Sequence, residues 1–151
     1  MWARILLLAF VLTAGCVDSA GAQTRPRAVE NPEEFTAKAI ERIEKGDLEG
    51  LARMIGTAVG LDISDGQLEA QIKQIGFVGT PQFFDRVHDQ TLGGSLRQMI
   101  YYAPFRTERG QMTFVFFNFV FMRANDGWYV THFRFDRNTN HLIPPGWITG
   151  K

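Results

Sequence analysis

The sequence contains very little cysteine and no excess of charge of either sign. Cys16 is the single cysteine among 151 residues, and 16 Lys and Arg balance 16 Asp and Glu. A chain without a basic surplus lacks the electrostatic footprint of a nucleic-acid-binding protein. Because one thiol cannot form an internal disulfide, the fold has to be stabilised by its hydrophobic core, which a domain of this size can supply.

The longest apolar run is too short to cross a membrane. It covers residues 5–12, follows the basic Arg4, and gives way to small residues at 20–22. A membrane helix needs about 20 consecutive apolar residues, whereas this three-part layout is typical of a secretory signal. We therefore predict a signal peptide over residues 1–22, a mature chain that begins at Gln23, no membrane span, and a periplasmic or secreted location.

Cys16 leaves a second interpretation of this leader open. In a lipoprotein, Cys16 would become the acylated first residue, a lipid anchor, after Thr13-Ala14-Gly15. Thr13 stands where such signals normally carry leucine or another aliphatic residue, so soluble export is favoured. On that interpretation the mature chain has no cysteine, which excludes disulfides, thiol nucleophiles and cysteine metal sites.

Motifs of the common catalytic classes are absent from the sequence. It contains no G-x-S-x-G, no glycine-rich phosphate loop, no H-E-x-x-H pair and no calcium loop. His88, His132 and His141 are 44 and 9 residues apart, so no two of them form a helical i, i+4 pair for zinc. We accordingly predict no metal ion and no cofactor.

Helices are predicted for the first part of the mature chain. Residues 23–31 show no apolar periodicity and are expected to form a flexible leader. Asn31 then provides an N-cap, a proline follows at the first helical position, and apolar residues recur at four-residue spacing until Gly46. Asp47 can cap a second helix and Ser64 a third, each with one apolar face.

Strands are predicted for the second part, because the apolar period changes from about 3.6 to about 2. Asn125-Asp126-Gly127 is a turn signal between strands expected over 113–122 and 128–136, and another strand is expected over 95–105. Helices followed by such a meander predict an α+β fold, with N-terminal helices packed on a curved antiparallel sheet. We assign this domain to residues 32–140 and a C-terminal tail to 141–151.

The predicted hairpin has two unlike faces. With a bulge at Gly127, one face is almost purely apolar and is expected to be the core beneath the helices: Val115, Phe117, Phe119, Phe121, Tyr129, Thr131, Phe133 and Phe135. The other face is amphiphilic and carries Phe114, Phe116, Asn118, Val120, Met122, Trp128, Val130, His132, Arg134 and Asp136. A mixed face of this kind lines a ligand pocket or meets another subunit.

Six residues are the candidates for ligand or interface contacts: His132, Arg134, Asp136, Asn118, Tyr102 and Trp128. Tyr101 and Tyr102 alternate, so one enters the core while the hydroxyl of the other reaches the mixed face. The group around His132 would suit proton transfer or oxyanion binding, although polar alternation along an exposed strand produces the same pattern. His88-Asp89, in contrast, is expected in a solvated turn.

Two stretches carry a resemblance to known proteins. The strand Gly-Trp-Tyr-Val-Thr-His-Phe-Arg-Phe at 127–135, preceded by amphipathic helices, resembles the nuclear transport factor 2-like superfamily of cone-shaped α+β domains. The stretch at 92–102, together with Asn125-Asp126-Gly127-Trp128, is also similar to a group of small exported bacterial proteins of unknown function. The superfamily includes ketosteroid isomerases, dehydratases and polyketide cyclases beside non-catalytic binding and dimerisation modules, and no catalytic motif carries over residue by residue.

These observations predict an exported domain that binds a small apolar ligand or a protein partner without catalysis. A homodimer is one such partner state, and nucleic acid is not expected. The alternative is a small isomerase, dehydratase or hydrolase that uses His132 with Asp136, or a tyrosine, in the cone implied by the resemblance. A cavity walled by His132 and Arg134 would indicate a ligand site, and a flat open face an interface.

Overall fold

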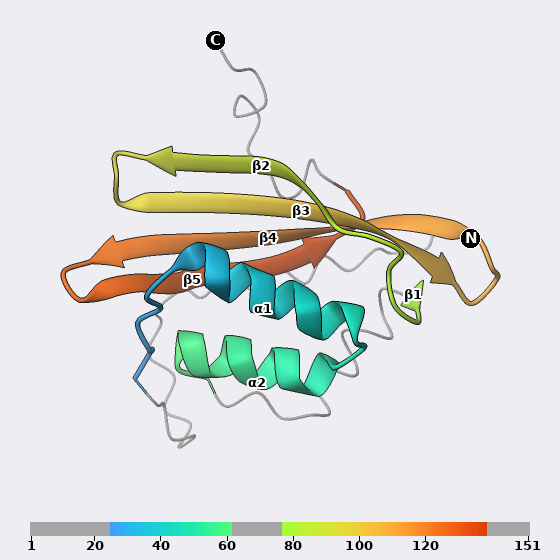
Figure 1. Ribbon diagram of the computed structural model, residues 1–151, viewed down its shortest axis with the longest axis horizontal. Helices are drawn as coiled ribbons and strands as arrows, with labels where there is room; N and C mark the ends of the chain where they lie inside the picture. Colours follow the sequence, from blue (N-terminus) through green and yellow to red (C-terminus); the bar gives the residue numbers. More distant parts are fainter. Residues whose placement is uncertain (1–24, 62–76, 139–151) are drawn as a thin grey trace, which may run out of the picture.

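The computed structural model describes residues 25–61 and 77–138. These ranges contain two helices and five strands, in the order α1 (Pro32–Glu44), α2 (Leu48–Val59), β1 (Phe77–Val78), β2 (Asp85–Leu92), β3 (Leu96–Thr107), β4 (Met112–Ala124) and β5 (Gly127–Asp136). Both helices lie on the same side of one antiparallel sheet (Figure 1). The predicted α+β arrangement is therefore confirmed.

Both helices begin at the caps that the sequence predicts. Oδ1 of Asn31 accepts a hydrogen bond of 2.9 Å from the N–H of Glu33, and Oδ1 of Asp47 accepts one of 2.9 Å from the N–H of Gly50. These bonds satisfy N–H groups that have no partner within the helix. The second helix ends at Gly60, whose φ of 73° is a left-handed conformation that glycine adopts without a steric penalty.

The strands form one sheet in the order β1-β3-β4-β5, and β2 pairs with the same edge of β3 as β1 does. The hairpin of β4 and β5 is confirmed, with Ala124 opposite Gly127 across the turn. The preceding strand is also confirmed as β3, which pairs with β4 along its length from Leu96 opposite Met122 onward. Each of these strands follows from local alternation and a local turn signal.

The hydrophobic core lies between the helices and the sheet. Phe35 of α1 meets Phe121 of β4 edge to face at 5.9 Å between ring centroids, and Phe119 packs against Phe133 at 4.9 Å. Full burial of one phenylalanine side chain contributes about 1.5–3 kcal/mol. The largest fully buried side chains in the described residues are Phe105, Phe119, Phe121, Ile43, Met99, Ile100, Val115 and Thr36.

The bulge in the hairpin lies within β5 at Thr131 and not in the turn, which corrects the predicted register. Val120 pairs with His132 and the next residue, Phe121, pairs with Val130. Thr131 therefore has no opposite residue, and its hydroxyl donates a 3.2 Å hydrogen bond to the carbonyl of Val120. Two residues of β5 thus occupy the length of one, which reverses the alternation of faces on the side toward the turn.

This register corrects the placement of four residues. Trp128 and Val130, predicted for the mixed face, pack on the helix-covered side, whereas Tyr129 pairs on the other side and Thr131 is exposed. The backbone of Trp128 also exchanges two hydrogen bonds with Val29, of 2.6 and 3.0 Å. These bonds attach Val29, which belongs to the predicted leader over 23–31, to the start of β5.

The short strand β1 and the longer strand β2 have no counterpart among the predicted elements. His88 and Asp89, expected in a solvated turn, lie in β2, where His88 pairs with Ile100 of β3. The side chains of β2 are mostly exposed, and the strand is irregular at Val87. An edge strand of this kind lacks the apolar alternation that identifies a strand in a sequence.

Four charged side chains connect the start of α1 to the sheet. The carboxylate of Glu33 accepts hydrogen bonds from Arg86 of β2 and Arg97 of β3. Arg97 also donates to both oxygens of Asp89, at 2.9 and 2.7 Å. This bidentate bond holds the pKa of Asp89 below its usual value. We refer to Glu33, Arg86, Asp89 and Arg97 as the charged clamp.

Some predictions concern residues outside the described ranges. These are the signal peptide at 1–22, the third helix with Ser64 at its cap, and the tail at 141–151.

Candidate functional site

The sheet face opposite the helices, which we call the outer face, carries most of the predicted site residues. The pairing of the strands places its side chains in four rows that run across the sheet: Asp85, Tyr102, Phe116 and Asp136; His88, Ile100, Asn118 and Arg134; Gln90, Gln98, Val120 and His132; Leu92, Leu96, Met122 and Tyr129. Polar residues dominate the two middle rows and apolar residues the last row, whereas the first row has two aromatic residues between two carboxylates.

Five of the six predicted site residues share this face: His132, Arg134, Asp136, Asn118 and Tyr102. Tyr102 is the outward member of its pair, and Tyr101 is buried beside Thr36 of α1, as the alternation predicts. Trp128 is not part of the site, because the bulge in β5 turns it toward the helices, where the guanidinium of Arg123 lies 5.8 Å from its ring.

A pair of side-chain amides occupies the middle of the outer face. Nε2 of Gln98 donates a 3.0 Å hydrogen bond to Oδ1 of Asn118, and the two residues are only 4% and 3% exposed. Gln98 was not among the predicted site residues, although its alternation with Tyr102 in a predicted strand contained the signal. Buried amides are stable only when they are hydrogen-bonded, so this pair fixes the registration of β3 against β4.

His132 lies in the row next to Arg134, at the β5 edge of the polar middle. Burial lowers the pKa of His132 below 6.5, and the positive charge of Arg134 lowers it further. The imidazole is therefore neutral at neutral pH. A neutral imidazole offers one donor and one acceptor nitrogen, which suits hydrogen bonding to a partner surface.

The geometry does not form the dyad of His132 and Asp136 that the enzymatic alternative needs. Asp136 instead accepts a 3.1 Å hydrogen bond from Arg134. His132 and Asp136 are four residues apart on one strand, which at about 3.3 Å per residue separates them by about 13 Å. Direct proton transfer requires heavy atoms within about 3 Å, so neither group can serve as the immediate partner of the other.

Aromatic residues gather at one end of the outer face around Tyr102. Phe83 meets its ring edge to face at 5.9 Å, and the rings of Phe114 and Phe116 lie at 5.9 and 6.1 Å. The hydroxyl of Tyr102 donates a 3.1 Å hydrogen bond to Asp85, which raises the pKa of the phenol. The tyrosine thus stays protonated and acts as a fixed hydrogen-bonding and packing group.

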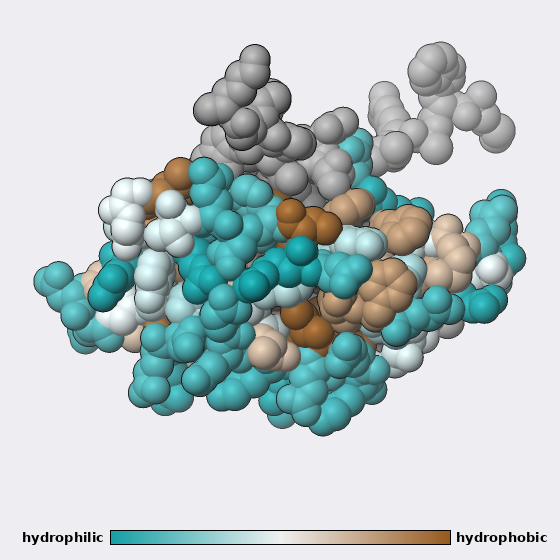
Figure 2. Space-filling model, turned by 45° about the horizontal axis from the view of Figure 1, so that its top comes forward, coloured by the Kyte–Doolittle hydropathy of each residue, from teal (hydrophilic) through white to brown (hydrophobic). Residues whose placement is uncertain are grey.

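Large apolar side chains remain exposed on and around this face. Phe114 is 49% exposed and Met122 is 48% exposed, at opposite ends of β4, and Met112 and Phe83 are exposed to a similar degree. In the space-filling view, apolar residues reach the surface toward the end of the molecule where β1 lies (Figure 2). Met112 belongs to that end, because it pairs with Arg106 beside β1.

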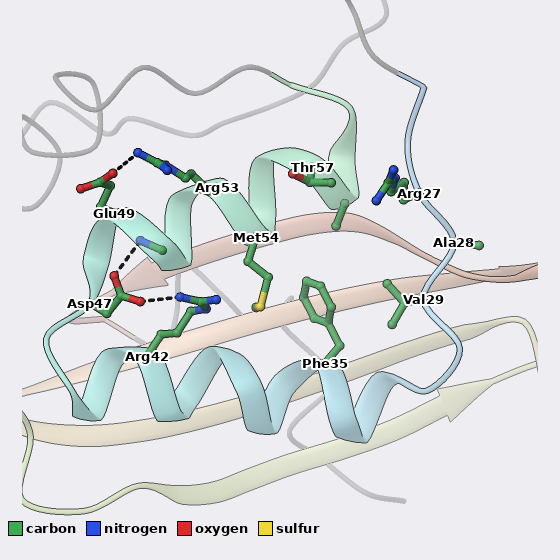
Figure 3. A pocket seen from close by; sticks show the side chains of 12 residues that line it. Arg27, Ala28, Val29, Phe35, Arg42, Asp47, Glu49, Arg53, Met54 and Thr57 are labelled. Carbon is green, nitrogen blue, oxygen red and sulfur yellow. Dashed lines mark hydrogen bonds and ion pairs between the residues drawn. The ribbon is translucent and has the colours of Figure 1, made fainter.

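A pocket lies on the other side of the sheet, between α1, α2 and the segment at 27–29 (Figure 3). Its volume is about 690 Å³, and none of the six predicted site residues lines it. Its lining comes from three segments: Arg27, Ala28 and Val29; Phe35 and Arg42 of α1; and Asp47, Glu49, Gly50, Arg53, Met54, Thr57 and Ala58 in and before α2. Sequence reasoning missed this pocket because it depends on how two helices and the leader pack together.

Comparison with known proteins gives a weak structural likeness. No protein-family model matches the sequence, and no curated protein matches it. A similar solved structure is a cystatin-like protein from Ruminococcus gnavus ATCC 29149, with 16% identity and a TM-score of 0.31. The match covers 72% of this chain and 38% of that chain. Membership of the nuclear transport factor 2-like superfamily therefore stays a prediction.

The described residues contain no metal-binding constellation and no membrane-spanning helix. Within 25–61 and 77–138, no group of three His, Cys, Asp or Glu side chains could hold a metal ion. Neither α1 nor α2, the helices of these ranges, is long and apolar enough to cross a membrane.

Proposed function

We propose that the protein is an exported, non-catalytic binding domain that docks a second copy of itself through the outer face. The observation that carries this proposal is the distribution of side chains on that face: a polar middle between an apolar end and an end where aromatic rings lie beside Asp85 and Asp136. Four large apolar side chains stay exposed to water on and around that face, which is unfavourable. Exposed apolar patches on soluble proteins are typical of interaction sites.

The arrangement supports a symmetric partner. Two copies can pack face to face about a two-fold axis that runs between the two sheets, parallel to them and at right angles to the strands. This axis would place the aromatic end around Tyr102 on the end formed by Leu96 and Met122 in the other copy. Each copy also presents a cation, Arg134, beside an anion, Asp136. A face with both signs of charge and two complementary ends can pair with itself, which is what an isologous dimer requires.

The size of the face supports the same conclusion. Four strands about 4.8 Å apart give the width of the face, and ten residues at about 3.3 Å each give its length. The flat area is roughly 600 Å², and the uneven surface of the side chains adds to it. A stable interface buries about 800 Å² on each partner. Most of the exposed part of the outer face would therefore take part, including His132, whereas the amide pair of Gln98 and Asn118 is already buried within the chain.

Size-exclusion chromatography with light scattering tests this proposal. The purified chain is expected to be a dimer at micromolar concentration, and Phe114→Glu is expected to be a monomer with an unchanged circular dichroism spectrum. Ala37→Glu is the matched control, because it adds the same charge at an exposed position of α1 on the helix side. A wild-type chain that stays monomeric, or a Phe114→Glu chain that stays dimeric, would contradict the proposal.

Export is proposed on the layout of residues 1–22, and intact mass tests it. The exported chain should begin at Gln23 and carry no lipid. A mass that includes residues 16–22 and acyl chains would instead identify Cys16 as a lipidated first residue.

A further inference from the structure

The pocket between α1, α2 and the segment at 27–29 has the features of a small-molecule site (Figure 3). Its volume of about 690 Å³ lies within the range of about 300–1,000 Å³ that such sites occupy. The segment at 27–29 forms the third wall of the pocket. It is held in place because the backbone N–H and C=O groups of Val29 are both hydrogen-bonded to Trp128. The wall at Val29 is therefore part of the packed fold.

The floor of the pocket is apolar. Val29, Phe35 and Met54 are half-buried and pack against the hydrophobic core, so the core continues into the pocket floor. Figure 3 shows the side chains of Phe35 and Met54 directed toward each other in the space between the helices. A ligand that covers them would remove apolar surface from water, which is favourable at about 25 cal/mol per Å².

Among the described residues, the charges around this floor leave one cation without a counter-charge. Arg42 is paired with Asp47, and Arg53 is paired with Glu49. Arg27 forms no ion pair with any carboxylate in the described part of the chain. Three arginines against two carboxylates give the pocket lining a net charge of +1.

The unpaired cation and the ion pairs lie at different ends of the pocket. Figure 3 shows Arg27 at the end where Thr57 lies, and the pairs of Arg42 and Arg53 toward the start of α2. The apolar side chains of Phe35 and Met54 lie between these ends, and Val29 lies beside Arg27. One end is therefore suited to an anionic head group and the middle to an apolar body.

We propose that this pocket binds an amphipathic monoanion, namely a carboxylate joined to an acyl chain. The chain lies over Phe35 and Met54, and the carboxylate pairs with Arg27, whose guanidinium can donate two parallel hydrogen bonds to it. A neutral ligand would leave Arg27 unpaired. A cationic ligand would face three guanidinium groups, and both carboxylates near it are already engaged.

Isothermal titration calorimetry with decanoate tests the proposal on the purified chain. Decanoate is expected to bind, and decyltrimethylammonium, which has the same chain and the opposite charge, is expected to bind at least tenfold more weakly. Arg27→Gln should weaken decanoate binding about ten- to a hundredfold, the scale of a hydrogen bond between charged groups. Thr57→Trp, at an exposed position of α2, should abolish binding by filling the pocket.

Two control variants make the result specific. Arg109→Gln removes an exposed arginine in the turn between β3 and β4, outside the pocket, and should bind decanoate as the wild type does. Phe114→Glu alters the outer face only and should also bind normally, so the outcome is independent of dimer formation. Absence of decanoate binding would overturn the proposal, as would binding that Arg27→Gln or Thr57→Trp leaves unchanged.

Discussion

Gln98 donates a 3.0 Å hydrogen bond to Asn118 across the boundary between β3 and β4, and both residues are almost fully buried. They are diagonal neighbours, since Gln98 pairs with Val120 and Asn118 with Ile100. Diagonal neighbours on one sheet face lie within reach of long side chains. The bond therefore exists only in the native registration of the two strands.

The first prediction concerns this amide pair. Asn118→Leu removes a buried acceptor and should lower the free energy of unfolding by about 1–3 kcal/mol, and Gln98→Leu should have an effect of similar size. The double variant Gln98→Leu/Asn118→Leu should be more stable than the sum of the single losses predicts, because neither amide remains to be desolvated. Urea denaturation of all variants in the Phe114→Glu background measures this coupling, and strictly additive losses would contradict it.

The second prediction compares the two faces of β4. Phe119 is 0% exposed on the helix side, and Phe114 is 49% exposed on the outer face. Phe119→Ala should lower the free energy of unfolding by about 3–5 kcal/mol because it leaves a cavity in the core. Phe114→Ala should lower it by less than about 1 kcal/mol when the chain is dilute enough to be monomeric. Equal losses would mean that both faces are buried in the folded monomer.

The third prediction is a pH dependence set by His132. Burial and Arg134 lower its folded pKa below the unfolded value of 6.5, so the unfolded chain binds more protons at mildly acidic pH. The stability that neutral His132 contributes is therefore complete above pH 6.5 and is lost as pH falls toward the folded pKa. His132→Gln should flatten the profile of urea midpoint against pH in this window. An unchanged slope in the variant would assign the dependence to other groups.

The fourth prediction concerns the charged clamp. Arg97→Gln removes bonds to both Glu33 and Asp89 and should lower the free energy of unfolding by about 1–2 kcal/mol, with a smaller effect at high salt. Lys45→Gln is the control, because its pair with Glu41 lies on the exposed surface of α1 and should contribute clearly less. Similar losses in the two variants would show that the clamp acts as an ordinary surface ion pair.

Acid titration provides a second readout of the same clamp. Arg97 lowers the folded pKa of Asp89 below 3.8, so the stability from this bond is present above that value. It is lost as pH falls through the folded pKa. The difference in stability between wild type and Arg97→Gln should therefore shrink in strong acid.

Features with local causes could be predicted from the sequence. The caps at Asn31 and Asp47 act on N–H groups within three residues, and the turn between β4 and β5 is encoded by adjacent residues. The mixed character of the outer face also followed from alternation alone, together with the position of Tyr102. Each of these needs only a short stretch of chain.

Features that depend on distant partners could not be predicted. The bulge at Thr131 has no marker of its own, because threonine is a residue that favours regular strands. β2 is an edge strand stabilised by its pairing with β3 and by the bond of Asp89 to Arg97, and neither is visible in its alternation. The pocket by Arg27 needs the leader to pair with Trp128, 99 residues from Val29 in the chain.

The bulge at Thr131 divides β5 into two parts. In one part the even-numbered residues face the helices, and in the other the odd-numbered residues do. Toward the turn, even-numbered residues such as Val130 face the helices, and beyond Thr131 the odd-numbered Phe133 and Phe135 do so. Deletion of Thr131 would remove the residue of β5 that has no opposite partner on β4, so Val130 and His132 would follow each other as in a regular strand and every other side chain would keep its present facing. The bulge is therefore a one-residue insertion that changes which residue numbers face the helices and leaves the pairing of β4 with β5 intact on both of its sides.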